Sequence, residues 1–221
     1  ADPALEDLGK EEFEEIRGKL LLTPDALPGF TGLFTVSHPH DKPAWSIVNG
    51  PDFFARVYDD TGQGAEFRDT NVNRYIADLS YEISPMWTVK SVTSFVDTNV
   101  KIDTPDGYTF FRDDERDYGD FSQDVQLTYD NPDSSFSGVF GLYAGRYDGH
   151  LQSDYRTTVL AGIGLPEADF QQLDATNLTK SIAAYADLRY DIGERVTLLG
   201  GGRILHDEVS ADYSGYLLDG D

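Results

Sequence analysis

Histidine and acidic side chains are the residues of this chain that could bind a metal ion. The sequence holds four histidines; His38 and His40 are the only close pair, and no further histidine is placed to complete a ligand set. The densest acidic run lacks the glycine spacing and the terminal glutamate of an EF-hand loop. Its members are candidates for a divalent-cation site, with a solvated charged loop as the simpler interpretation: Asp113, Asp114, Glu115, Asp117 and Asp120.

The sequence shows no catalytic motif. Serine, histidine and acidic residues do not occur in the arrangement of a catalytic triad. Three consecutive glycines, Gly200 to Gly202, precede Arg203, but no Lys-Ser or Lys-Thr pair follows as a phosphate-binding loop requires. Close packing of strands is our interpretation of these glycines. We therefore expect neither an enzyme nor a bound cofactor.

Aromatic residues in segments expected to be long loops are the main candidates for ligand contact. Exposed aromatic side chains in loops often bind ligands. The alternative is that they pack the loops together or form an outer girdle. The candidates are Trp45, Phe53, Phe54 and Tyr58 in a first loop, and Tyr108, Phe110 and Phe111 in a second.

Charge and composition exclude several classes of protein. The 221 residues carry 40 acidic and 17 basic side chains, a formal net charge of −23. Nucleic acid is excluded as a partner because phosphate binding requires the opposite sign, whereas divalent cations or a basic partner are compatible with this surface. The 13 Tyr and 13 Phe residues argue against a disordered chain, and the absence of cysteine rules out disulfides.

Residues 179–207 show most clearly which elements position these side chains. Apolar residues from Ile182 to Tyr190 alternate with mostly polar ones, and the alternation resumes after a tight turn at Asp191–Glu194. A period of two indicates strands, and each arm is about twice as long as the usual strand of a globular protein. Long strands that are apolar on one side and charged on the other are typical of a barrel wall with lipid outside and water inside.

The same pattern predicts an all-β protein, an antiparallel up-and-down meander of about eight long strands that forms part of a transmembrane β-barrel. Residues 1–10 are expected to be a tail, 11–210 the barrel segment and 211–221 the start of a further loop. The strands are predicted near 11–22, 30–38, 68–84, 87–102, 118–130, 136–152, 177–190 and 195–207. Long loops are predicted at 39–66, 103–116 and 153–176, the last with a possible helical turn at 167–173.

The alternation also predicts which side chains face lipid and which face the lumen. Outward-facing positions should include Tyr75, Leu79, Val125, Leu127, Ala184 and Leu188. Inward-facing positions should include Arg74, Asp78, Asp124, Asp187 and Arg189. Short turns alternate with longer connections, and aromatic residues cluster beside the short turns, which is typical of an interfacial girdle: Phe30, Tyr81, Trp87, Tyr129, Phe136 and Tyr190.

Four stretches resemble the barrel of TonB-dependent outer-membrane receptors. Trp87–Phe95 is similar to a strand of that family in which Lys-Ser-Ile-Thr and an aromatic residue follow a short turn. Phe121–Leu127 and Gly138–Tyr143 resemble its Phe-Ser-Gln-Glu-Ile-Arg-Leu and Trp-Val-Ala-Gly-Leu-Tyr strands. Ser181–Arg203 resembles a hairpin that ends in Gly-Leu-Arg-Tyr, with Ile204 and Leu205 in place of the aromatic residue. Plugged barrels of this kind have about 22 strands, so the resemblance implies a segment of a receptor.

The resemblance implies a function in transport. The expected function is TonB-dependent uptake of a scarce solute through the bacterial outer membrane, an iron–siderophore chelate first, a cobalamin or a glycan otherwise. The expected partners are that solute or metal chelate, outer-membrane lipid, and the TonB complex acting through a plug domain outside this chain. The alternative is a binding module, either a self-contained eight-stranded barrel or a β-sandwich that recognises a ligand or a surface through its loops.

Overall fold

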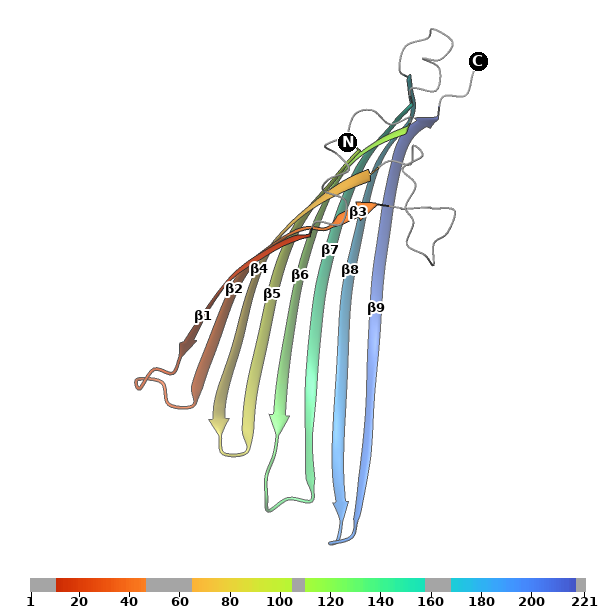
Figure 1. Ribbon diagram of the computed structural model, residues 1–221. Coiled ribbons are helices and arrows are strands. Elements are labelled where there is room, and N and C mark those ends of the chain that lie inside the picture. The colour runs from red at the N-terminus through yellow and green to blue at the C-terminus, as the bar shows by residue number, and fades with distance from the viewer. Residues whose placement is uncertain (1–10, 47–64, 105–109, 158–167, 218–221) are drawn as a thin grey trace, which may run out of the picture.

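The computed structural model describes residues 11–46, 65–104, 110–157 and 168–217, and every regular element within them is a β-strand. Figure 1 shows these strands running side by side as one curved layer, with the short connections gathered at its lower end. The strands are β1 (Glu12–Leu22), β2 (Phe30–Lys42), β3 (Ala44–Ser46), β4 (Ala65–Ser84), β5 (Trp87–Asp103), β6 (Phe110–Tyr129), β7 (Phe136–Thr157), β8 (Ala168–Ile192) and β9 (Val196–Leu217).

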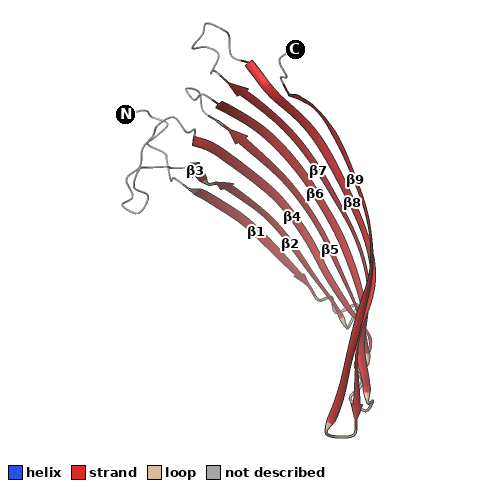
Figure 2. Cartoon of the chain, turned by 90° about the vertical axis from the view of Figure 1, so that its right-hand side faces the viewer, coloured by secondary structure: helices blue, strands red, loops and turns tan. Residues whose placement is uncertain are grey.

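The strands form one antiparallel meander. Their order is β1-β2-β4-β5-β6-β7-β8-β9, and the short β3 pairs with β4 beside that path. All described strands belong to this one sheet, so the sandwich alternative, which needs two packed sheets, is wrong for the described residues. The predicted fold class, an up-and-down meander of eight long strands, is confirmed. Figure 2 shows the sheet turned by 90° from the view of Figure 1, with the bend that its strands share.

The strands extend well beyond the ends that the sequence predicts, and always at the end opposite the short turns. The loop predicted at 103–116 is wrong from Phe110 onward, because β6 begins there, and the loop at 153–176 contains the end of β7 and the start of β8. The helical turn predicted at 167–173 is wrong, since β8 occupies it from Ala168. The loop predicted from residue 211 is wrong up to Leu217, and the loop at 39–66 includes strand residues at both of its ends.

The upper end of β6 shows no alternation because both of its faces are charged from Arg112 to Asp117. Ion pairs and hydrogen bonds between side chains on β5 and β6 stabilise this part of the sheet. Lys101 Nζ lies 3.0 Å from a carboxylate oxygen of Glu115, its neighbour on β6. Asn99 donates a hydrogen bond of 2.8 Å to Asp117, also directly opposite on β6. Opposite-charge and hydrogen-bonding pairs stabilise a ladder without requiring an apolar face.

The short turns at the lower end have the chemistry that their sequences predict. Gly29 and Gly193 have φ angles of 82° and 63°, a region that glycine enters without steric penalty. In the turn between β6 and β7, the backbone N–H of Asp133 donates to the side-chain oxygen of Asn131 (3.1 Å), and the N–H of Ser134 donates to the Asn131 carbonyl (3.0 Å). This Asx-type turn fixes the register of two strands of about twenty residues each.

The register assigns every side chain to one of two faces. Tyr75, Phe95 and Phe121 are successive partners on β4, β5 and β6, so they share a face that we call the outer face. The opposite, inner face is the crowded one. Among the described residues, eight that are not glycine are buried, and seven of these lie on the inner face: Ser37, Thr70, Val100, Ile102, Asp114, Ser153 and Ala183. The eighth, Phe111, lies on the outer face. Crowding is expected on the inside of a curve, where neighbouring side chains converge.

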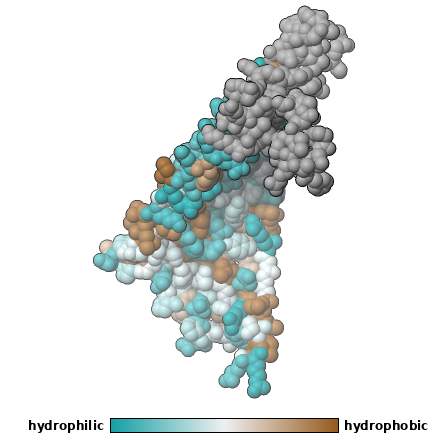
Figure 3. Space-filling view, viewed as in Figure 1, coloured by the Kyte–Doolittle hydropathy of each residue, from teal (hydrophilic) through white to brown (hydrophobic). Residues whose placement is uncertain are grey.

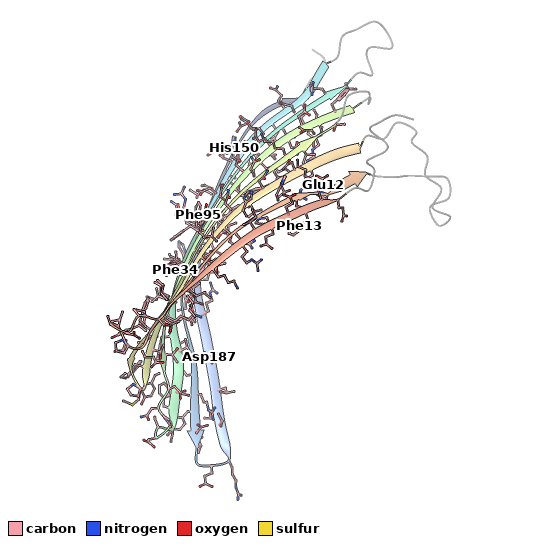
Figure 4. All side chains as sticks on the ribbon, turned by 60° about the vertical axis from the view of Figure 1, so that its left-hand side comes forward. Glu12, Phe13, Phe34, Phe95, His150 and Asp187 are labelled. Carbon is pink, nitrogen blue, oxygen red and sulfur yellow. The ribbon has the colours of Figure 1, made fainter. Side chains whose placement is uncertain are left out.

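The register confirms that the two predicted sets lie on opposite faces of the sheet. The six apolar positions and the five charged positions named from the sequence fall on the outer and the inner face, respectively. Figure 4 shows Phe34, Phe95 and His150 projecting from one side of the sheet and Asp187 from the other.

Gly141 on β7 illustrates how the inner face is packed. A Cβ added to Gly141 would lie 2.0 Å from a ring carbon of Tyr185, because this tyrosine of β8 lies across the glycine. Its hydroxyl reaches β6, where it donates to Asp124 (2.8 Å) and accepts from Gln126 (2.9 Å). Because the Tyr185 side chain crosses β7 and hydrogen-bonds to β6, it links β6, β7 and β8 in addition to the backbone hydrogen bonds between these strands.

Candidate functional site: the two faces of the sheet

The lower end of the outer face carries a row of aromatic residues. The six aromatic residues that the sequence places beside the short turns all lie on this face and pair across strands: Phe30 with Tyr81, Trp87 with Tyr129, and Phe136 with Tyr190. The ring centroids of Trp87 and Tyr129 are 4.7 Å apart, and those of Tyr129 and Phe136 are 6.0 Å apart. The expected clustering of aromatic residues at the turn end is therefore present as one continuous row.

A second aromatic row, which the sequence analysis missed, crosses the same face higher up. Tyr75, Phe95 and Phe121 are cross-strand partners, and the rings of Tyr75 and Phe95 lie 6.2 Å apart. Along β6, Phe121 and Tyr129 are eight residues apart, about 27 Å of strand. A strand tilt of about 40° reduces that to a height of roughly 20 Å, close to the apolar band of outer-membrane barrels.

The surface between the two rows is mostly apolar and exposed, and its polar residues Ser91, Thr93 and Gln123 hydrogen-bond to one another. Leu142 on β7, Ile182 on β8 and Ile204 on β9 have 64%, 61% and 81% of their surface exposed, and Phe34, Val125 and Phe140 belong to the same band. Water-exposed apolar patches of this extent are rare in soluble monomers and indicate contact with a membrane or another apolar partner. We call the outer face between the two aromatic rows the apolar belt.

Above the upper row the outer face is polar. The histidine pair lies in β2, not in a loop, and each member already has a partner: His38 bonds with Asn73 and His40 with Asp69, both at 2.9 Å. Lys42 also contacts Asp69, at 3.0 Å. On β7, His150 lies 3.3 Å from Asp174 of β8. These contacts link neighbouring strands and give His38, His40 and His150 partners within the sheet.

On the inner face at the same height, Asp114 is at the centre of an ionic network. Its side chain is fully buried, and it accepts hydrogen bonds from Arg112, from Arg116 (2.7 Å) and from the hydroxyl of Ser153. Asp114 lies seven residues beyond Phe121 and so outside the apolar belt. Burial alone would raise the pKa of Asp114, but the hydrogen bonds from Arg112, Ser153 and Arg116 hold it below its ordinary value.

The acidic run is not one cluster, because a strand sends successive side chains to opposite faces. Asp113, Glu115 and Asp117 lie on the outer face, where Asp113 pairs with Arg156 of β7. Asp114 and Asp120 point to the inner face. Within the part of the chain that the structure describes, no group of three or more acidic or histidine side chains is arranged to hold a metal ion.

The aromatic residues predicted to contact a ligand lie in several environments. Phe111 is in β6 and buried, with the guanidinium of Arg156 5.7 Å from its ring centroid. Phe110 begins β6, and Trp45 lies in β3 opposite Glu66. Phe53, Phe54, Tyr58 and Tyr108 fall outside the described residues.

Tyrosines on the inner face are a set that the sequence analysis overlooked. Tyr118 on β6 and Tyr147 on β7 stack with ring centroids 6.0 Å apart, and Arg203 on β9 lies 5.4 Å from the ring of Tyr143. The alternation of glycine and tyrosine at inner positions from Gly141 to Gly149 was the available signal. With Tyr185, these tyrosines and Arg203 give the inner face a surface of half-buried aromatic rings and polar groups. Such a surface is suited to contact with a solute that carries planar or polar groups.

Among the described residues there is no helix with the length and apolar character needed to span a membrane.

Figure 3 shows the side of the sheet that faces the viewer in Figure 1. Hydrophilic residues gather over its upper part, and hydrophobic residues follow the edge formed by β9. Exposed inner-face residues of that strand include Leu199 and Val209, with exposures of 76% and 68%.

Comparisons with known proteins identify the fold. No protein-family model and no curated protein sequence matches this chain. Among solved structures it is similar to the ferric yersiniabactin uptake receptor FyuA from Yersinia pestis, with a TM-score of 0.78 and 20% identity over 96% of this chain. It is also similar to the ferric citrate transporter FecA in its unliganded form, with a TM-score of 0.70 and 13% identity over 94% of this chain.

This chain spans only 32% of the length of FyuA and 31% of that of FecA. Both names describe uptake or transport rather than catalysis. At these identities the likeness is one of fold, and the fold expected from the resemblance to TonB-dependent receptor barrels is confirmed.

Proposed function

We propose that this chain forms part of the wall of a receptor barrel in a bacterial outer membrane. The observation that carries the proposal is the exposed apolar belt on one face of a receptor-type sheet. An aromatic row follows its lower side, and Tyr75, Phe95 and Phe121 on β4 to β6 follow its upper side, where Arg146, Lys180 and Glu208 continue the level on β7 to β9. Lipid covers such a belt, and aromatic side chains settle at the two membrane–water interfaces. The mixed polar inner face then lines the lumen.

The receptor takes up a scarce solute. An iron–siderophore chelate is the first candidate because both similar structures are named for ferric ligands; a cobalamin or a glycan is the remaining option. Energy comes from the TonB complex acting through a plug that occupies the lumen. The reaction forms no covalent bond and needs no resident cofactor, and nucleic acid is not a partner.

The solute binds on the side of the barrel opposite the short turns, which we assign to the cell exterior. Long external loops and short periplasmic turns support this assignment. We propose as contact residues the aromatic candidates of the upper segments, namely Trp45, Phe53, Phe54, Tyr58, Tyr108, Phe110 and Phe111. The inner-face tyrosines, Tyr118 and Tyr147 first, would continue the contact surface into the lumen.

Removing about ten residues within 49–62 should abolish or weaken uptake without preventing folding. Exposed loops can be shortened at small entropic cost, and the loss of contacts worth about 1.4 kcal/mol already lowers affinity about tenfold. The experiment measures uptake of a radiolabelled ferric siderophore, cobalamin and an oligosaccharide in cells that carry the full natural polypeptide or the deletion. Heat-modifiable electrophoretic mobility reports folding of the same variants.

Shortening the turn at Asn131–Ser134 is the matched control. Its hydrogen bonds fix the register of β6 and β7, so this deletion should damage assembly itself. If the turn deletion removed only uptake and the loop deletion removed only folding, the assignment of the two sides would be backwards. If cells with and without the full natural polypeptide took up equal amounts of each of the three solutes, the proposed uptake function would be wrong.

A further inference from the structure

The glycines at Gly200 to Gly202 are not all explained by close strand packing. Gly201 lies on the inner face, where an added Cβ would approach the backbone oxygen of Ala186 to 3.1 Å. Gly200 and Gly202 lie on the outer face opposite Leu188 and Ala186, and a Cβ on either would meet no atom within 4 Å. Two of the three glycines therefore leave open space on the outer face.

That open space is an apolar groove in the belt. It has a volume of about 530 Å³ and lies along β8 and β9, with Phe136, Leu188, Tyr190 and Leu198 among its walls and Gly200 and Gly202 at its floor. From Leu198 to Gly202 the strand advances about 13 Å. The groove starts beside Tyr190 and Phe136 of the lower aromatic row, and Ile204, 81% exposed, lies just beyond its upper end.

We propose that this groove seats one acyl chain of a membrane lipid. It runs from the aromatic row that marks the interface toward the middle of the belt, which is the direction in which an acyl chain enters the bilayer. Its exposed walls are leucine and aromatic side chains, and its floor is glycine backbone beside the small side chain of Ala186, so a flexible chain gains contacts along its length. A second copy of the chain is the competing occupant, and the test separates the two. The proposal rests on the proposed membrane function.

The experiment is photolabelling of the full natural polypeptide in vesicles of phosphatidylethanolamine and phosphatidylglycerol that contain a phospholipid with a diazirine in its acyl chain. Labelled positions are mapped by peptide mass spectrometry. We expect labelling at Leu188 and Leu198 to exceed severalfold that at Leu20, an outer-face residue with 56% exposure on β1. The double variant Gly200→Leu/Gly202→Leu should reduce groove labelling to the level at Leu20.

Gly18→Leu is the matched control, because Gly18 also lies on the outer face with no atom within 4 Å of an added Cβ. It should leave groove labelling unchanged. Equal labelling of groove and Leu20 in the natural protein, or groove labelling that survives the double variant, would overturn the lipid site. Groove-to-groove cross-links between two protein copies would assign the groove to self-association. No acyl labelling anywhere on the outer face would instead overturn the membrane function.

Discussion

Replacing Asp114 with asparagine should lower the free energy of unfolding by about 3–5 kcal/mol, the range for removing one partner of a buried ion pair. The variant leaves Arg112 and Arg116 facing a neutral amide in a position where Asp114 is fully buried. The loss should show as a lower urea midpoint for the full natural polypeptide refolded in bilayers, with an unchanged slope. Asp113→Asn is the matched control, since Asp113 is 37% exposed and exposed ion pairs contribute about 0–1 kcal/mol.

The contribution of Asp114 should also depend on pH in a defined direction. Its pKa is lowered in the folded protein, so the stabilisation is fully present above the unfolded-state pKa of about 4 and is lost as the pH falls through the lower folded-state value. The difference in stability between the natural protein and Asp114→Asn should therefore be constant near neutrality and shrink in acid. A difference that grew on acidification would contradict the ionic network.

A charge in the apolar belt should have a comparably large effect. Leu142 lies about midway between Phe136 and Arg146 on the outer face of β7 and is 64% exposed. Leu142→Arg should lower stability in bilayers by about 2–4 kcal/mol, the cost of an arginine near the midplane of a membrane barrel. The same variant should lose less stability in a denaturant titration performed in thin micelles of a short-chain detergent, where the side chain reaches water.

Two variants serve as controls for that result. Gln152→Arg places the same charge on the same face above the upper aromatic row, where about 0–1 kcal/mol is expected. Ser122→Arg places it on the inner face, opposite Ser94, where water and neighbouring carboxylates accommodate it. Equal losses for all three arginines would show that the belt does not face lipid.

The sequence was most informative where one face of the sheet is apolar. Tyr75 to Ile83 and Phe121 to Tyr129 lie inside the belt, and their alternation predicted both the strands and the direction of each side chain. Beyond Phe121 the strand carries charge on both faces, as the Arg112–Arg116 run illustrates. A run of that composition has no periodic signal, so it was taken for a loop although register pairs such as Lys101 and Glu115 hold it in the ladder.

The residues that come together in the candidate site were predicted less well than the strands. Which residues converge depends on the register between strands, and a single sequence does not give that register. Phe95 and Phe121 were visible as aromatic residues, but only their pairing with each other and with Tyr75 makes them a row. Asp114 and Ser153 are 39 positions apart in the chain and meet across β6 and β7, a contact that alternation within one strand could not reveal.

Lipid and water accessibility along the strands is the most direct test of the membrane assignment. These 221 residues contain no cysteine, so a single cysteine for spin labelling can be introduced at a chosen position of this segment. The labels are measured in the full natural polypeptide in bilayers, with any cysteine elsewhere in it replaced. Labels at Leu79, Val125 and Ala184 should collide with oxygen dissolved in lipid and be shielded from a water-soluble nickel chelate. Labels at Asp78, Asp124 and Asp187 should show the reverse. Equal access of the nickel chelate to both sets would contradict a membrane barrel.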